Sequence, residues 1–206
     1  VVRASDGVSL VRRGGERVSL AVSGRVEVLG RGKSNALAVA SGKAHRFDLS
    51  GKLVAVVEVG EGATAVTRIE DSVIVGYGDG NVELKRVGAS DESLHATPAS
   101  AVVRLEAGPR GTLLVGYANG EVGLWGLKNR RRLLHDRLHG PVTHMQVVGQ
   151  AAYLATGLGG HLTWDLGAFH SDRCTLLRQV WQRVPVVWER GRAVVRKPPT
   201  VHPCAN

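Results

Sequence analysis

The chain has 206 residues, of which 43% are hydrophobic and 22% charged, which excludes wholesale disorder. No run approaches the roughly 18–20 apolar residues of a membrane helix, and no signal peptide opens the chain, so we expect a cytoplasmic protein without membrane insertion. The excess of 27 Lys and Arg over 18 Asp and Glu gives a net charge of +9, which favours anionic partners without identifying one.

A repeat of about 40 residues runs through the first 166 positions. Residues 73–84 and 113–124 align without a gap, and a weaker copy covers 153–166. An earlier copy covers 36–49, and an incomplete one begins near residue 6. The large residue near the end of the last matched strand marks each copy: Leu10, Phe47, Leu84, Leu124 and Trp164. The regular spacing of these residues predicts a repeat architecture.

Each copy has the pattern of a strand, a tight turn and a second strand. The turns contain residues that tolerate a positive φ, and they are Asp79-Gly80, Asn119-Gly120 and Gly159-Gly160. A strand-like segment precedes each hairpin at 65–69, 102–105 and 142–148, and a polar stretch such as 130–139 can form an outer strand. Four short strands per repeat predict an all-β fold, a β-propeller of four-stranded antiparallel blades with about four to five blades present.

The repeats resemble the WD40 family. Trp164-Asp165 matches the dipeptide that closes a WD40 repeat, and Phe47-Asp48 is a close stand-in in an earlier copy. The resemblance implies that residues 1–168 are WD40-like blades, as in bacterial multidomain proteins. Because propellers use roughly four to eight blades, we expect an incomplete ring, the C-terminal part of a larger propeller. A protein partner or an upstream domain would complete it. The missing initiator Met fits a cut or processed end.

Residues 169–206 follow a different pattern, that of a helix, a hairpin and a tail. The helix is predicted over 172–184, where Ser171 or Asp172 can cap its start and Pro185 stops it. Five apolar residues share one of its faces: Leu176, Leu177, Val180, Trp181 and Val184. A small hairpin is predicted over 186–195. We expect this appendage to pack on the last blade and to shield its edge.

No constellation of catalytic, cofactor-binding or metal-binding residues emerges. His170-Ser171-Asp172 contains the residue types of a catalytic triad, but neighbours in sequence have the wrong geometry, and a helix cap explains them better. Cys174 and Cys204 could form a disulfide, which would fit an exported protein, or bind a metal with nearby histidines. The Cys-x₂-Cys spacing typical of zinc sites is missing, so we predict no metal site and no cofactor.

Two clusters of basic residues form a candidate contact surface for an anionic partner. They comprise Arg130, Arg131 and Arg132 in the repeats and Arg190, Arg192, Arg196 and Lys197 near the C-terminus. Few aromatic residues are interleaved with them, which disfavours a groove for single-stranded nucleic acid. The leading hypothesis is therefore a non-catalytic protein-interaction or sensing module. The alternative is binding of nucleic acid or an acidic surface by the basic C-terminal region.

Overall fold

The computed structural model describes residues 2–4, 7–11, 14–32, 35–86, 88, 90–94, 100–196 and 201–204. The chain divides into two compact units, Val1–Trp164 and Asp165–Asn206, and each is described by itself.

The first unit consists of antiparallel sheets formed by strands that follow one another in the chain. An N-terminal sheet contains β1 (Val2–Ala4), β2 (Gly7–Val11) and β3 (Arg17–Leu20). Blade 1 contains β4 (Val26–Gly32), β5 (Asn35–Ala40), β6 (Lys43–Asp48) and β7 (Leu53–Glu58). Blade 2 contains β8 (Ala63–Ile69), β9 (Ser72–Tyr77), β10 (Val82–Lys85) and β11 (Glu92–Leu94).

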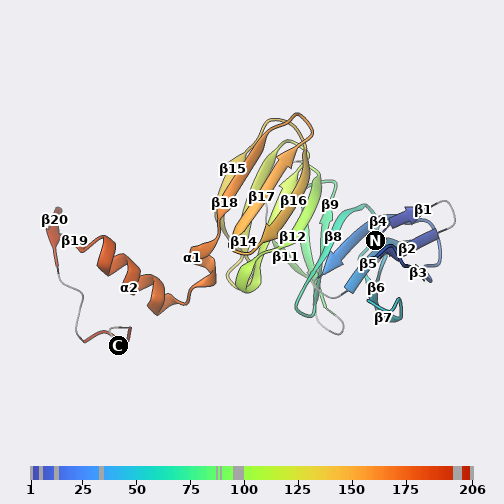
Figure 1. Cartoon of the computed structure of the whole chain (residues 1–206), viewed down its shortest axis with the longest axis horizontal. Helices are drawn as coiled ribbons and strands as arrows, with labels where there is room; N and C mark the ends of the chain where they lie inside the picture. Colours follow the sequence, from blue (N-terminus) through green and yellow to red (C-terminus); the bar gives the residue numbers. More distant parts are fainter. Residues whose placement is uncertain are drawn as a thin grey trace. The chain divides into compact units, whose positions relative to one another are not determined.

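Two more blades follow in the same order. Blade 3 contains β12 (Val102–Ala107), β13 (Thr112–Tyr117), β14 (Glu121–Gly126) and β15 (Arg131–Arg137), with a short 3₁₀ turn at Pro109–Gly111 before β13. Blade 4 has three strands in the described residues, β16 (Val142–Val148), β17 (Ala151–Thr156) and β18 (His161–Asp165). Blades 3 and 4 lie side by side (Figure 1), in agreement with the contacts between β12 and β16.

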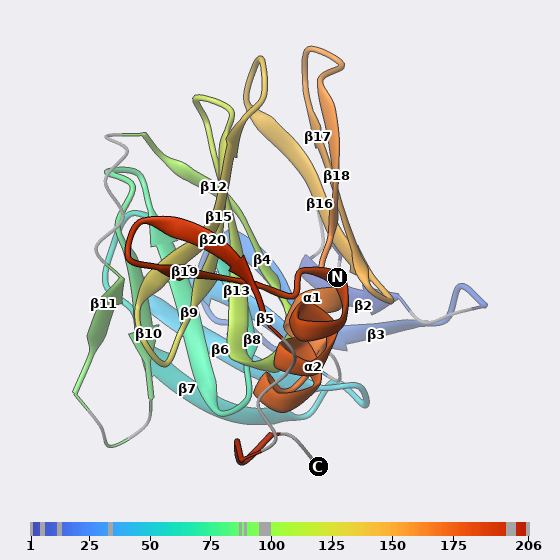
Figure 2. The same ribbon diagram turned by 90° about the vertical axis from the view of Figure 1, so that its left-hand side faces the viewer.

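The first strands of successive blades meet at the inside of an arc. β8 contacts both β4 and β12, and β12 contacts β16, while the later strands of each blade lie farther out. Figure 2 shows the strands of blade 2, β8 to β11, in this order from the inside outward. The single bridge between β4 and β8, from Arg31 to Thr67, is parallel, as expected where two blades meet instead of continuing one hairpin. The chain therefore forms a β-propeller with an incomplete ring, as predicted.

Apolar side chains on both faces of the second strands hold the blades together. All six residues of β13 are buried because blade 2 covers one face and blade 4 the other. Leu113 and Val115 belong to a core that also contains Ile74 of blade 2. The side chains between them point the other way, since successive residues of a strand alternate in direction. Burial of such residues contributes about 25 cal/mol for each Å² of apolar surface removed from water.

The strand registers correct the sequence alignment by one residue. Val73 pairs with Lys85, Leu113 with Trp125 and Ala36 with Phe47. Lys85, Trp125 and Phe47 are therefore equivalent, whereas the alignment placed Leu84 and Leu124 at this position.

The turn of blade 4 makes Trp164 equivalent to Lys85, Trp125 and Phe47. The amide of Thr156 donates to the carbonyl of Gly160 at 2.8 Å, as that of Tyr77 does to Asn81 at 3.0 Å. The residue with a positive φ is Gly159, so the turn is Leu158-Gly159 and the predicted Gly159-Gly160 turn is wrong. The first two strands are joined by four residues in blade 3 and by two residues in blade 4. Equivalent residues of the two blades are therefore not separated by the constant number of positions that the sequence alignment assumed.

The second unit contains the predicted helix, α2 (Arg173–Arg183), and the predicted hairpin, β19 (Val186–Glu189) and β20 (Arg192–Val195). It also contains a short helix that was not predicted, α1 (Gly167–His170). The Asp172 carboxylate caps α2 by accepting from the amide of Thr175 at 2.9 Å and from its hydroxyl at 2.7 Å. These hydrogen bonds lower the pKa of Asp172 to about 2. No residue of α2 is buried, and its packing on the last blade stays a prediction.

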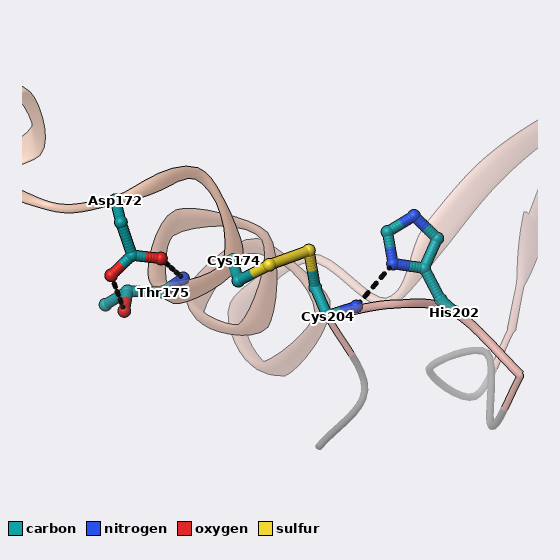
Figure 3. Close-up of a disulfide and its surroundings, with 5 residues drawn as sticks. All are labelled: Asp172, Cys174, Thr175, His202 and Cys204. Carbon is teal, nitrogen blue, oxygen red and sulfur yellow. Dashed lines mark hydrogen bonds between the residues drawn. A yellow bond between two sulfur atoms is a disulfide. The ribbon is translucent and has the colours of Figure 1, made fainter.

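A disulfide joins α2 to the C-terminal segment. Cys174 and Cys204 are bonded, with their Cα atoms 4.8 Å apart and 30 residues of separation in sequence (Figure 3). His202 lies beside the bridge, where its Nδ1 accepts from the amide of Cys204 at 3.0 Å. The structure thus decides between the pairing and the metal-binding alternatives in favour of the disulfide. Within the described residues, no helix is both long and apolar enough to span a bilayer.

Candidate functional site

The innermost strands of the four blades line a groove of about 570 Å³. Each of β4, β8, β12 and β16 contributes three or four consecutive residues, so that successive blades supply parallel rows of side chains to one surface. Because side chains alternate along a strand, each row presents both polar and apolar groups. The polar or charged side chains at this surface are Glu27, Thr64, Arg104, Glu106, Thr143, His144 and Gln146.

Hydrogen bonds between neighbouring blades fix the walls of the groove. The Thr64 hydroxyl of blade 2 lies 2.6 Å from the carbonyl oxygen of Val102 in blade 3, to which it donates. Arg104 of blade 3 donates from Nε to the carbonyl of Thr143 in blade 4 at 2.9 Å. Each bond joins the innermost strand of one blade to that of the next. The groove is therefore a rigid surface that three successive blades hold in place.

Both signs of charge occur at the groove. Glu27 and Glu106 are acidic, Arg104 is basic, and His144 is an exposed imidazole among them. Such mixed polarity suits a partner that offers hydrogen-bond donors and acceptors together, as a polypeptide does. The lining residues in the described part of the chain include no serine or cysteine. The described residues also hold no group of three or more His, Cys, Asp or Glu side chains placed to bind a metal.

A polar network around Tyr77, Glu83 and Lys85 connects blade 2 to the segment that follows blade 1. The Tyr77 hydroxyl lies 2.5 Å from the carbonyl oxygen of Val59 and 2.9 Å from Glu83 Oε2, so that its single proton faces two acceptors. Lys85 Nζ lies 2.8 Å from Glu83 Oε2 and 2.6 Å from Asp91 Oδ2. Burial and the bond to Glu83 raise the pKa of Tyr77 far above its usual value. Burial alone would lower the pKa of Lys85, but its hydrogen bonds to Asp91 and Glu83 outweigh burial and raise it.

Sequence reasoning missed this network. Lys85 occupies the position that Trp125 and Trp164 take in later blades, so a charged residue replaces the aromatic residue found there. Its side chain is only 10% exposed and is tolerated because two carboxylates neutralise it. Part of the signal was present in the sequence, because a period-2 pattern places Glu83 and Lys85 on one side of their strand. Asp91 follows a loop, and only the pairing of β10 with β11, which sets Leu84 opposite Glu92, brings it beside Lys85.

The predicted basic residues lie in both units, and several of them contact other side chains. Arg130 pairs with Glu92 at 2.8 Å, Arg196 pairs with Glu189 at 2.5 Å, and the Arg132 guanidinium lies 5.9 Å from the centre of the Trp125 ring. Arg130, Arg132 and Arg196 therefore already contact other side chains of this chain. Among the described residues, the exposed members without a charged or aromatic contact are Arg131 on β15, Arg190 in the β19–β20 turn and Arg192 on β20. Lys197 lies outside the described residues.

Comparisons with known proteins identify the fold and no family. No protein-family model matches the chain, and no curated protein matches it. Among solved structures, the computationally designed Ika4 protein is similar with 24% identity and a TM-score of 0.59, over 75% of this chain and 100% of Ika4. The designed Ika8 protein matches with 23% identity and a TM-score of 0.57, over 73% of this chain and 49% of Ika8.

A natural protein gives a comparable match. BamB from Moraxella catarrhalis is 18% identical with a TM-score of 0.56, over 81% of this chain and 54% of BamB. The chain thus spans about half the length of Ika8 and BamB and the full length of Ika4. These likenesses support the β-propeller fold but not WD40 repeats specifically.

Proposed function

We propose that the chain is a non-catalytic protein-binding module whose contact surface is the groove along β4, β8, β12 and β16. The single observation that carries this proposal is the groove itself, a rigid mixed-polarity surface to which four successive blades contribute. Propellers present broad, fixed surfaces of this kind, and rigid surfaces lose little entropy when a partner binds. The fold neighbours support the propeller fold on which this surface is built.

The relation to WD40 repeats, the partner that adds blades and the cellular compartment are also proposals. Trp164-Asp165 and Phe47-Asp48 occupy equivalent places in their blades, which supports kinship with WD40 repeats. A protein partner or an upstream domain would add the remaining blades. The disulfide favours an oxidising compartment over the expected cytoplasm, because cytosolic thiols are kept reduced.

Site-specific photo-crosslinking tests the groove. With a photoreactive residue in place of His144, in the cells that naturally produce the chain, we expect covalent adducts to a protein, identified by mass spectrometry. The matched control replaces Arg131, an exposed residue on the outer strand β15, and should give at least tenfold less adduct. Adducts formed only at 131, or adducts to nucleic acid, would refute groove binding. Arg104→Glu should lower the yield of the adduct at 144, since it reverses a charge at the groove.

The anionic-partner alternative has one observation in its favour, the exposed guanidiniums of Arg131, Arg190 and Arg192. If these groups contact phosphates, the affinity for a short DNA duplex should fall with salt. Each charge-removing substitution should then reduce the slope of log K against log salt by about 0.9. Fluorescence anisotropy between about 50 and 200 mM salt measures this slope. An affinity independent of salt, or unchanged in the triple Arg→Gln variant, excludes this function.

A further inference from the structure

A second pocket, with a volume of about 490 Å³, lies where the first strands of blades 2 and 3 end. Blade 1 contributes Asn35, the first residue of β5, and blade 2 contributes Arg68 near the end of β8. The turn from β8 to β9 and the connection from β12 to β13 add Glu70, Asp71 and Arg110. None of these residues lines the groove, so the pocket is a separate site.

Asn35 and Arg68 lie on the two sheet faces that meet between blades 1 and 2. Because side chains alternate along a strand, Asn35 shares a face of β5 with Leu37 and Val39. By the same rule, Arg68 shares a face of β8 with Val66. Leu37, Val39 and Val66 belong to one hydrophobic core. Asn35 and Arg68 are therefore polar residues at one end of an apolar interface.

Each of these two side chains has a buried polar atom that lacks a hydrogen-bond partner within the part of the chain that the structure describes. The atoms are Oδ1 of Asn35, an acceptor, and Nε of Arg68, a donor. Asn35 is only 7% exposed. An unpaired polar group is costly to bury, and native proteins contain few of them. A molecule that carries both a donor and an acceptor would satisfy the two atoms together.

The residues equivalent to Asn35 in the next two blades are hydrogen-bonded within their own blades. The strand registers identify them as Ser72 and Thr112, the first residues of β9 and β13. Both are as buried as Asn35, at 6% exposed. The Ser72 hydroxyl accepts from Nε of Arg86 at 2.7 Å. The Thr112 hydroxyl donates to the carbonyl of Pro109 at 2.7 Å, so an unpaired atom is not a general feature of this position.

The residue that faces this position also differs between the blades. Arg68 pairs with Val73 on the second strand of its blade. Ala107 makes the equivalent pair in blade 3, with Leu113. The facing residues between blades 2 and 3 are therefore Ser72 and Ala107, of which only the serine is polar. An unpaired donor that faces an unpaired acceptor thus distinguishes the interface of blades 1 and 2 from the next one.

The charges around the pocket favour a neutral ligand. Nη2 of Arg68 lies 3.1 Å from Oδ1 of Asp71, so a carboxylate already balances the guanidinium. Glu70 and Arg110 are exposed and add one charge of each sign. An amide is a neutral group that carries both an N–H donor and a carbonyl acceptor. The Asn35 carboxamide can turn toward such a group, because its terminal torsion has broad minima.

We propose that this pocket binds an amide, whose N–H donates to Oδ1 of Asn35 and whose carbonyl accepts from Nε of Arg68. The amide belongs either to a carboxamide, as in a glutamine side chain or a small molecule, or to a peptide bond. A carboxamide presents N–H and C=O along one edge, whereas a trans peptide bond presents them on opposite sides. The proposal does not depend on the groove, with which the pocket shares no residue.

Titration of the isotope-labelled full-length chain, followed by NMR, tests the site. Acetamide should shift the side-chain signal of Asn35 in a saturable manner. Asn35→Leu should weaken binding about tenfold, read from the backbone amide of Asp71. N,N-dimethylacetamide has the carbonyl but no N–H, so it should also bind about tenfold more weakly than acetamide.

The outcomes separate the two sources of the amide from a wrong proposal. Saturable binding of N-methylacetamide would identify a peptide bond as the ligand, and its absence would identify a carboxamide. An absent acetamide shift, equal binding of N,N-dimethylacetamide, or unchanged binding to Asn35→Leu would each overturn the proposal. Failure of groove binding would change none of these measurements.

Thermal unfolding separates a loss of binding from a loss of folding. Asn35→Leu removes an unpaired polar group at similar volume, so its midpoint should be no lower than that of the wild type. The matched control is Asn81→Leu, because the Asn81 carboxamide contacts Glu83 Oε1 at 3.2 Å and the Ser93 hydroxyl at 2.8 Å. This control should lose about 2–4 °C and keep its affinity for acetamide. If Asn35→Leu loses as much as Asn81→Leu, Oδ1 of Asn35 is paired within the protein and the proposal is wrong.

Discussion

Leu124→Glu is expected to abolish the stable packing of blade 4 on blade 3, with a loss of more than about 4 kcal/mol in the free energy of unfolding. Leu124 is fully buried in blade 3, where it pairs in register with Leu114 and Leu134. The substitution removes an apolar side chain and leaves a carboxylate in an apolar environment. Since domains have only about 5–15 kcal/mol of stability, this loss approaches the total.

Urea unfolding followed by tryptophan fluorescence measures this effect, since Trp125 follows Leu124 on β14 and Trp164 lies on β18 of blade 4. Leu124→Met is the matched control, because it conserves volume and should cost less than about 1.5 kcal/mol. A loss for Leu124→Glu no larger than that for Leu124→Met would contradict the prediction.

Removal of the disulfide is expected to unfold the second unit while the blades stay folded. The Cys174→Ser, Cys204→Ser double variant opens a loop of 30 residues, and the chain-entropy model assigns such a loop about 3.6 kcal/mol. The unit has little else to replace this contribution. α2 has 11 residues, none of them buried, and a two-stranded hairpin such as β19–β20 is only marginally stable by itself.

Far-UV circular dichroism should show the loss of the helical signal in the double variant, and reduction of the wild type should reproduce it. The reductant should have no effect on the double variant, which serves as the control. If both cysteines of the non-reduced wild type react with a thiol reagent, the disulfide is absent and the prediction is wrong.

Local patterns in the sequence were sufficient to predict the propeller. Asn119-Gly120 and Asp79-Gly80 specify tight turns whatever surrounds them, and Gly80 and Gly120 adopt the expected positive φ. The start of α2 was predictable for a similar reason, because Asp172 caps it through atoms only three residues away. The hairpin around Arg190-Gly191 also formed where predicted.

The register of the repeats was less predictable. A fixed spacing aligned Trp164 with Leu124, but the strand ladder aligns it with Trp125, because connections of different length shift the later strands. A one-residue shift moves every side chain to the opposite face of a strand. Under the fixed spacing, Tyr153 and Thr163 were therefore compared with residues of the wrong face.

The sequence by itself determined the elements and their order, because turn residues, caps and period-2 alternation act over a few neighbouring residues. Which sheet faces of the blades pack together and which stay exposed depends on the tertiary structure. The groove, the neutralisation of Lys85 by two carboxylates and the pairing of Cys174 with Cys204 each bring together residues from separate segments. Such contacts depend on distances in space, and these are set only when the blades pack.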